Sequence, residues 1–195
     1  MKVGIFGGSF NPIHNTHVRI IEEILRRKLV DEVWVLPCRD HPFNKKFESA
    51  EHRVNMINLA IKEMDSKKVK ICDVELNSNE KSYTYDTIKK LKEKYNHEFS
   101  LIIGSDLLKE IEKWYKYLEL VNEIKFIIFL REGYPIVLPK SLKNACIIRE
   151  DPNNTSSSKI RERLYNSEAI NYFVPCKVEK YIKKNKLYVN NNNLK

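Results

Sequence analysis

The stretch KVGIFGGSFNPIHNTH, residues 2–17, decides the fold of this chain. Its apolar run Val3–Phe6 predicts a buried strand, and the residues from Asn15 onward, apolar at helical spacing, predict a helix. Between them, Gly7 and Gly8 allow the backbone to come close to a ligand, because glycine has no Cβ atom. A strand, a glycine loop and a helix start in this order predict an anion-binding corner, since free N–H groups and the helix dipole point the same way.

Two histidines, His14 and His17, stand three residues apart at this helix start, which we expect Asn15 or Thr16 to cap. Residues at this spacing share a helix face, so both imidazoles can donate hydrogen bonds to one phosphate group. The alternative is a structural corner with one exposed histidine. The stretch matches neither the Walker motif nor the GxGxxG fingerprint, and the nearby sequence offers no convincing third metal ligand. We therefore favour a phosphate loop of another kind.

Apolar, β-branched runs alternate with amphipathic stretches along the rest of the chain. This alternation predicts an α/β fold with a mostly parallel sheet flanked by helices, and ligand binding at the carboxyl ends of the strands. We expect a single domain over residues 1–195, with a frayed tail at 190–195. The expected strands are 3–6, 32–37, 69–76, 99–103, 125–130 and 145–148; the expected helices begin at 15 and span 49–64, 82–95, 111–121, 156–165 and 175–185.

Composition and charge narrow the choice of partners. The formal net charge of +9 is typical of proteins that bind nucleic acid, but the lysines are interleaved with acids along the predicted helices. We therefore expect a solvated basic surface that favours small anionic substrates, and no nucleic-acid partner. Four cysteines without a CxxC pair indicate free thiols in the cytoplasm. We expect no signal peptide and no membrane contact, and the oligomeric state is left open, a homo-oligomer included.

Three further features each allow a structural and a functional interpretation. Gly104–Asp106 follows a predicted strand. It is either a simple turn, or a binding segment in which the Asp106 carboxylate accepts a hydrogen bond from a ribose hydroxyl. A predicted helix begins within TSSSKIRER, residues 155–163. The hydroxyl run is either an N-cap ahead of a solvated basic face, or part of a phosphate clamp that includes Arg161. Trp114 is either a core residue or a stacking platform for a nucleotide ring. The residues alone leave these alternatives open.

Several segments, in one order, resemble the bacterial nicotinate-nucleotide adenylyltransferases of the nucleotidyltransferase superfamily. GGSFNPIHNTH, from Gly7, is similar to the family's GGSFDPxHxGH signature, and TSSSKIR, from Thr155, to its ISSTxIR motif. Further family motifs are matched by SAEHR (49–53), SYTYDT (82–87), the segment from IIGSD to Trp114, and VPCKVEKYIKKNKLY (174–188). The resemblance therefore covers nearly the whole chain.

The resemblance implies a Rossmann-like nucleotidyltransferase fold and Mg²⁺-dependent adenylyl transfer from ATP to nicotinate mononucleotide, with nicotinamide mononucleotide as a further acceptor. The products would be deamido-NAD and pyrophosphate, in NAD biosynthesis. Mg²⁺ would be held mainly by the ATP phosphates, without a metal site of protein ligands. The alternatives are a related transferase with a pantetheine phosphate or cytidylyl-type acceptor, and a non-catalytic nucleotide sensor or nucleic-acid-binding regulator.

The resemblance also carries the family's site roles to matching positions of this chain. It implies three catalytic residues, His14, His17 and Arg161. The implied ATP-binding residues are Gly7, Gly8, Ser9, Phe10, Gly104, Asp106, Ser157 and Ser158. The implied pyridine-nucleotide-binding residues are Tyr83, Thr84, Trp114 and Lys45.

The chain departs from the family pattern in three places. Asn11 stands in place of the signature's Asp, which is expected to remove a negative charge beside the phosphates. Thr16 stands in place of Gly, which is expected to put a branched side chain where the family keeps space for the nucleotide. RDHPFNKK, residues 39–46, does not align with the family's PPHK loop near the acceptor.

Overall fold

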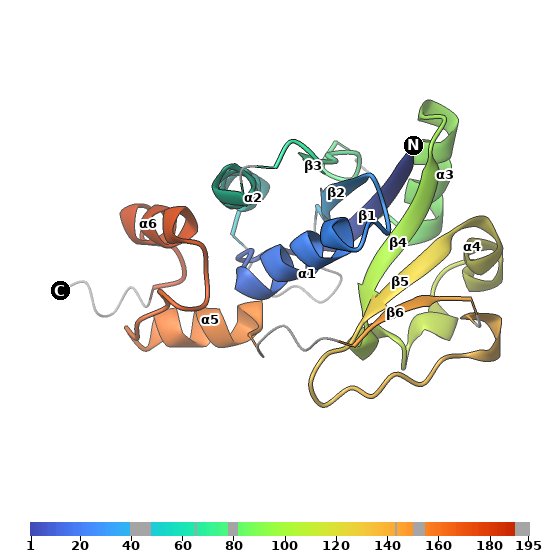
Figure 1. The fold of residues 1–195 in the computed structure, drawn as a ribbon. Helices are drawn as coiled ribbons and strands as arrows, with labels where there is room; N and C mark the ends of the chain where they lie inside the picture. The colour runs from blue at the N-terminus through green and yellow to red at the C-terminus, as the bar shows by residue number, and fades with distance from the viewer. Residues whose placement is uncertain (40–47, 65, 78–81, 143, 150–154, 190–195) are drawn as a thin grey trace.

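The computed structural model describes residues 1–39, 48–64, 66–77, 82–142, 144–149 and 155–189. Its centre is a six-stranded sheet with the order β3-β2-β1-β4-β5-β6, in which every neighbouring pair is parallel (Figure 1). The strands are β1 Lys2–Gly8, β2 Glu32–Pro37, β3 Val69–Ile71, β4 Glu98–Gly104, β5 Lys125–Phe129 and β6 Cys146–Ile148. The predicted α/β fold with a parallel sheet is confirmed.

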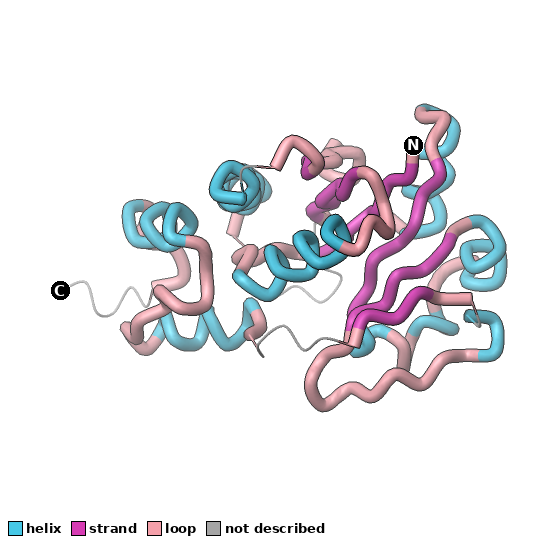
Figure 2. The backbone as a smooth tube through the Cα atoms, viewed as in Figure 1, coloured by secondary structure: helices cyan, strands magenta, loops and turns pink. Residues whose placement is uncertain are grey.

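Helices cover the sheet on both faces, as the backbone trace shows (Figure 2). The α-helices are α1 Asn15–Arg26, α2 Ala50–Met64, α3 Thr84–Lys94, α4 Tyr117–Glu123, α5 Ser157–Tyr165 and α6 Cys176–Lys184. Short 3₁₀ turns are η1 Ser105–Leu107, η2 Ile111–Lys113 and η3 Lys140–Leu142. Among the described residues, none of these helices combines the length and the apolar character that crossing a membrane requires.

The sheet separates two hydrophobic cores, because successive residues of a strand point to opposite faces. In β1, Phe6 belongs to a core built with α1, α2, α5 and α6, whereas Ile5 belongs to a core built with α3 and α4. On α1 the buried apolar residues are Ile20, Ile21 and Ile24. The helical spacing predicts a stripe of Val18, Ile21, Leu25 and Leu29, of which Val18, Leu25 and Leu29 are only partly buried. The buried face of α1 is therefore rotated from the predicted one.

Strand β3 ends at Ile71, so the strand predicted to run to Leu76 is too long. The N–H of Cys72 still donates to the Val35 carbonyl at 2.8 Å, after which the chain turns. This turn directs the Glu75 carboxylate to the hydroxyl of Thr87 on α3, at 2.9 Å. The apolar residues alone do not indicate where β3 ends, because the strand ends where its pairing with β2 ends.

The helix predicted over residues 111–121 is also wrong, because it is broken into η2 and α4. Between them Trp114 is extended, with ψ 146°, and Lys116 adopts a left-handed conformation with φ 50°. The break changes which side chains face the core. Leu118 is 65% exposed, whereas Tyr117 and Leu120 are buried.

Candidate active site

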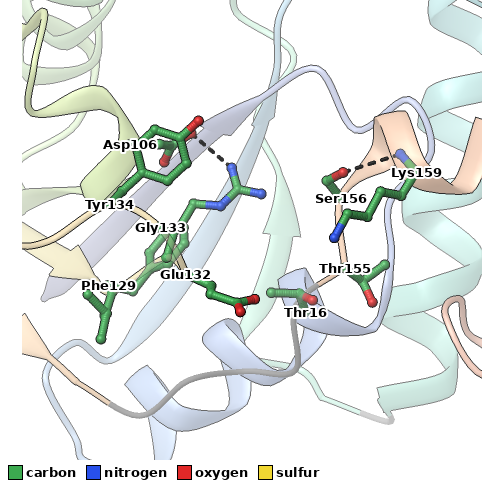
Figure 3. Close-up of a pocket in the computed structure, with 11 residues that line it drawn as sticks. Thr16, Asp106, Phe129, Glu132, Gly133, Tyr134, Thr155, Ser156 and Lys159 are labelled. Carbon is green, nitrogen blue, oxygen red and sulfur yellow. Dashed lines mark hydrogen bonds and ion pairs between the residues drawn. The ribbon is translucent and has the colours of Figure 1, made fainter.

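Loops from different parts of the chain meet at the carboxyl edge of the sheet, where they form an open pocket of about 480 Å³. Figure 3 shows side chains from the start of α1, from the ends of β4 and β5, and from the start of α5 around this pocket. The lining residues include Thr16, Asp106, Arg131, Tyr134, Thr155, Ser156 and Lys159. The structure thus brings the exit of β4 and the TSSSKIR segment to one pocket at the start of α1. The described residues that line it do not include Gly7, Gly8, His14, His17 or Arg161.

The glycine corner, residues 7–17, lies at the end of β1 as predicted. A Cβ atom on Gly7 would have no neighbour within 4 Å, so the backbone here is open to an approaching ligand. On Gly8 a Cβ atom would lie 3.1 Å from the ring of Phe10. Phe10, with φ 46°, is buried beneath the loop, and its ring packs edge-on against the His17 ring with centroids 5.0 Å apart. Phe10 therefore shapes the loop from inside.

The two predicted histidines are stacked on each other, with ring centroids 3.7 Å apart and an angle of 25° between the planes. The backbone N–H of His14 donates to Nδ1 of His17 at 3.2 Å. His14 is the N-cap residue of α1, so the expected caps Asn15 and Thr16 are wrong. Because Nδ1 of His17 accepts this N–H, a neutral His17 carries its proton on Nε2 and donates from there.

Burial keeps both rings uncharged near neutral pH. Burial, reinforced by the positive charge of Arg131, lowers the pKa of His14 to about 3. Burial, then the neighbouring His14 and Arg131, lowers the pKa of His17 well below its usual value. Nδ1 of His14 is buried without a hydrogen-bond partner in the described part of the chain.

A buried arginine that the sequence analysis missed holds the loop from below. Arg53 is 1% exposed and donates to the main-chain carbonyls of Ser9 at 2.9 Å, Arg39 at 2.8 Å and Glu48 at 3.2 Å. These carbonyls accept hydrogen bonds from the guanidinium, which ties the loop to the start of α2. The signal in the sequence that could have pointed to Arg53 is its place in the SAEHR segment, among polar residues of a predicted helix.

A second missed arginine, Arg131, follows β5 and pairs with Asp106 across the pocket wall, at 2.9 Å. Ser105 reinforces this pair, because its Oγ accepts from the N–H of Arg131 at 2.9 Å and donates to the Tyr134 carbonyl at 2.6 Å. Gly104 leaves room for both: a Cβ atom there would collide with Asp106 and lie 2.9 Å from Cδ of Arg131. A basic residue directly after a predicted strand was the signal for Arg131.

The start of α5 is tied to the glycine corner. Ser156 caps the helix by accepting from the N–H of Lys159 at 3.2 Å. The hydroxyl of Ser157 donates to the Pro12 carbonyl at 2.9 Å. Arg161 donates to the Asn11 carbonyl at 2.8 Å and to Ser158 Oγ at 3.2 Å.

The two substituted signature positions differ in where they point. Thr16 lines the pocket, as expected from its place in the signature. Asn11, expected beside the phosphates, is 1% exposed, and its amide oxygen accepts from the hydroxyl of Tyr188 and the N–H of Glu48. Its side chain is therefore enclosed by protein rather than turned toward the pocket.

The predicted pyridine-nucleotide residues lie around the start of α3 and the break before α4. Tyr83 is the N-cap residue of α3, Thr84 begins the helix, and the Tyr83 ring lies 4.7 Å from the ring of Tyr115. Trp114 is partly buried against the α3–α4 core. Tyr115, which the sequence analysis missed, joins Tyr83 to the Trp114 segment. Lys45 lies outside the described residues.

Within the residues described, no group of three or more His, Cys, Asp or Glu side chains is placed to hold a metal ion. The polar groups around the corner are instead N–H donors, hydroxyls and cations. This donor set complements phosphate oxygens, and a divalent cation would fit here as a companion of a polyphosphate.

Comparisons with known proteins agree with this geometry. A family model described as cytidylyltransferase-like matches residues 5–163. The nicotinate-nucleotide adenylyltransferase of Bacillus subtilis (strain 168) is 38% identical over 190 residues, covering 96% of this chain and 98% of that protein. The Plasmodium falciparum nicotinic acid mononucleotide adenylyltransferase complexed with NaAD matches with TM-score 0.80 and 30% identity, over 100% of this chain and 99% of that one. A structure of the same Plasmodium protein complexed with APC matches with TM-score 0.79 and 31% identity.

The buried histidine pair predicts that acid destabilises the fold. His14 has a pKa of about 3 in the folded chain, against an ordinary value of 6.5, so the unfolded chain binds more protons below about pH 6.5. The free energy of unfolding should fall as the pH is lowered, by about 2 kcal/mol at pH 5 from this group alone. Denaturant unfolding of wild type and His14→Gln at pH 7 and pH 5 measures the effect. The pH dependence should be weaker in the variant, and an equal dependence would mean that His14 is protonated in the folded state.

Proposed function

The chain belongs to the nicotinate-nucleotide adenylyltransferase family, and we propose from this membership that it transfers the adenylyl group of ATP to nicotinate mononucleotide. The products are deamido-NAD and pyrophosphate, so the reaction is a step of NAD biosynthesis. The observation that carries the proposal is the stacked, uncharged histidine pair beside the open glycine corner, in which Nδ1 of His17 accepts an N–H and leaves Nε2 as the donor.

We propose that the triphosphate lies between the glycine corner and the start of α5. Gly7 leaves the backbone open, and the adjoining N-terminus of α1 favours negative charge. On the other side, Lys159 and Arg161 supply positive charge for the outer phosphates. Ser157 and Ser158 support this arrangement by binding Pro12 and Arg161. Gly104 and Asp106, in the opposite wall, are proposed to face the adenosine.

The chemistry requires no protein nucleophile, because the acceptor phosphate is already anionic and attacks the α-phosphorus of ATP directly. His17, donating from Nε2, stabilises the charge that develops on the phosphoryl oxygens in the transition state. Arg161 is proposed to stabilise the leaving pyrophosphate. Mg²⁺, held mainly by the ATP phosphates, would supply further charge neutralisation when bound.

We propose that the pyridine ring of the acceptor binds near Tyr83, Thr84 and Trp114. Trp114, at the break between η2 and α4, offers an indole ring for stacking on the pyridine. Lys45 stays a prediction, as does the use of nicotinamide mononucleotide as a second acceptor. The comparisons name the nicotinate enzyme, which favours the acid as the main acceptor.

We further propose that residues 1–195 act as one nucleotidyltransferase domain, because the site draws on elements from β1 to α5. The four cysteines are free thiols in the structure, which suits the reducing cytoplasm as the place of the reaction.

The proposal is tested by measuring pyrophosphate release from ATP and Mg²⁺, with nicotinate mononucleotide and its amide compared in parallel. We expect release with the nicotinate form and a higher kcat/KM for it than for the amide. Folded protein that binds ATP but releases no pyrophosphate with either would contradict the proposal. It would indicate another acceptor or a nucleotide sensor.

His17→Ala should lower kcat by about 10²–10³, because one transition-state donor is lost from a buried site. Steady-state kinetics with circular dichroism as the check on folding measures this. His97→Ala is the matched control, because His97 precedes β4 at the opposite edge of the sheet. An unchanged kcat in His17→Ala would remove this residue from the mechanism.

Trp114→Ala should raise KM for nicotinate mononucleotide about three- to tenfold, as expected for the loss of one aromatic stacking contact. KM for ATP should stay close to that of wild type, because the glycine corner and α5 are unaltered. Both constants come from varying one substrate at saturation with the other. A change confined to ATP would mean that the acceptor pocket is elsewhere.

A further inference from the structure

Three segments that are far apart in the sequence converge on one residue of the glycine corner, Asn11. Its side-chain Oδ1 accepts from the hydroxyl of Tyr188 at 2.7 Å and from the N–H of Glu48 at 3.3 Å. Its main-chain carbonyl accepts from Arg161 at 2.8 Å. Asn11 is therefore held on the α2 side, on the α5 side and by the segment that follows α6.

The contact with Tyr188 closes a ring of hydrogen bonds. The backbone N–H of Tyr188 donates to the carboxylate of Glu48 at 3.3 Å, and the backbone N–H of Glu48 donates to the oxygen of Asn11 that Tyr188 also binds. Leu187, directly before Tyr188, is buried in the core formed with α1, α2, α5 and α6. Burial raises the pKa of the Tyr188 phenol far above its usual value, so its hydroxyl stays a donor at every working pH.

Asn11 stands three residues before His14, so a shift of Asn11 is passed to the stacked histidines through a very short piece of chain. Phe10 on its other side packs against the His17 ring. Elsewhere in the loop, the Gly8 carbonyl accepts from the N–H of Cys38, the Ser9 carbonyl from Arg53 and the Pro12 carbonyl from Ser157. These bonds hold main-chain carbonyls, whereas Tyr188 holds the side chain of Asn11. Misplacement of a catalytic group by about 1 Å can reduce a rate about a hundredfold.

We propose that Tyr188 is a positioning residue for adenylyl transfer: by binding Asn11, it fixes the loop that carries His14 and His17. This inference rests on the proposed function. The hydroxyl of Tyr188 binds the enclosed side chain of Asn11, so Tyr188 acts through Asn11 and not on the substrates. The C-terminal segment thus forms part of the support of the site, although it lies outside the elements that border the pocket.

Tyr188→Phe removes only the hydroxyl and should lower kcat about tenfold, the size expected for one lost hydrogen bond to a buried acceptor. KM for nicotinate mononucleotide should be unchanged, since the proposed acceptor pocket is attached to α3 and α4. The measurement is steady-state kinetics at a temperature where the variant is fully folded by circular dichroism.

Tyr181→Phe is the matched control. Tyr181 lies on α6 in the same C-terminal segment, and its hydroxyl bonds to His52 and Asn55 of α2 at 2.9 and 3.1 Å. This variant should lose stability as Tyr188→Phe does, yet keep the wild-type kcat, because its hydroxyl does not touch the glycine corner. An equal loss of kcat in both variants, or none in Tyr188→Phe, would overturn the inference.

A second measurement separates this inference from the proposed function. In NMR spectra, the imidazole resonances of His14 and His17 should shift in Tyr188→Phe and stay in place in Tyr181→Phe. If wild type shows no turnover, the proposed function fails. The spectra then still decide whether Tyr188 positions the histidines, and unshifted resonances in Tyr188→Phe would refute it.

Discussion

The glycine corner depends on one buried cation. The loop after β1 is not part of the sheet ladder, and the guanidinium of Arg53 gives it three fixed points by donating to the carbonyls of Ser9, Arg39 and Glu48. A buried charge is costly to leave without hydrogen bonds, so the loop and the arginine stabilise each other. The same arginine therefore fixes the position of the loop that is proposed to bind phosphate.

The histidine pair contributes hydrogen-bond donors and not further positive charge. Although they lie at the corner that is proposed to bind phosphate, both rings are held neutral by burial and by Arg131. Positive charge comes from arginines and a lysine around the corner, while the histidines contribute directed N–H groups. Neutral donors hold their geometry whether or not a phosphate is present, which suits groups that must be in place before the transition state forms.

Much of this arrangement was predictable, because its signals are local. The apolar run before Gly7, the helical spacing after Asn15 and the alternation of strands and helices each depend on neighbouring residues, and they predicted the parallel sheet and the gathering of loops at its carboxyl edge. The missed features depend on contacts between distant segments. Arg53 could not be distinguished from a surface arginine, the break at Trp114–Lys116 interrupts an otherwise continuous stripe, and Asn11 gives no sign of a partner as distant as Tyr188.

The division of the core by the sheet has an evolutionary consequence. The corner that is proposed to bind ATP is packed on the core of α1, α2, α5 and α6, whereas Tyr83 and Trp114 belong to the side of α3 and α4. Mutations in the second half can accumulate without repacking the first, because the two sets of apolar side chains are on opposite faces of the strands. Substitutions that alter the acceptor pocket can thus be accommodated in one core while the core beneath the glycine corner keeps its packing.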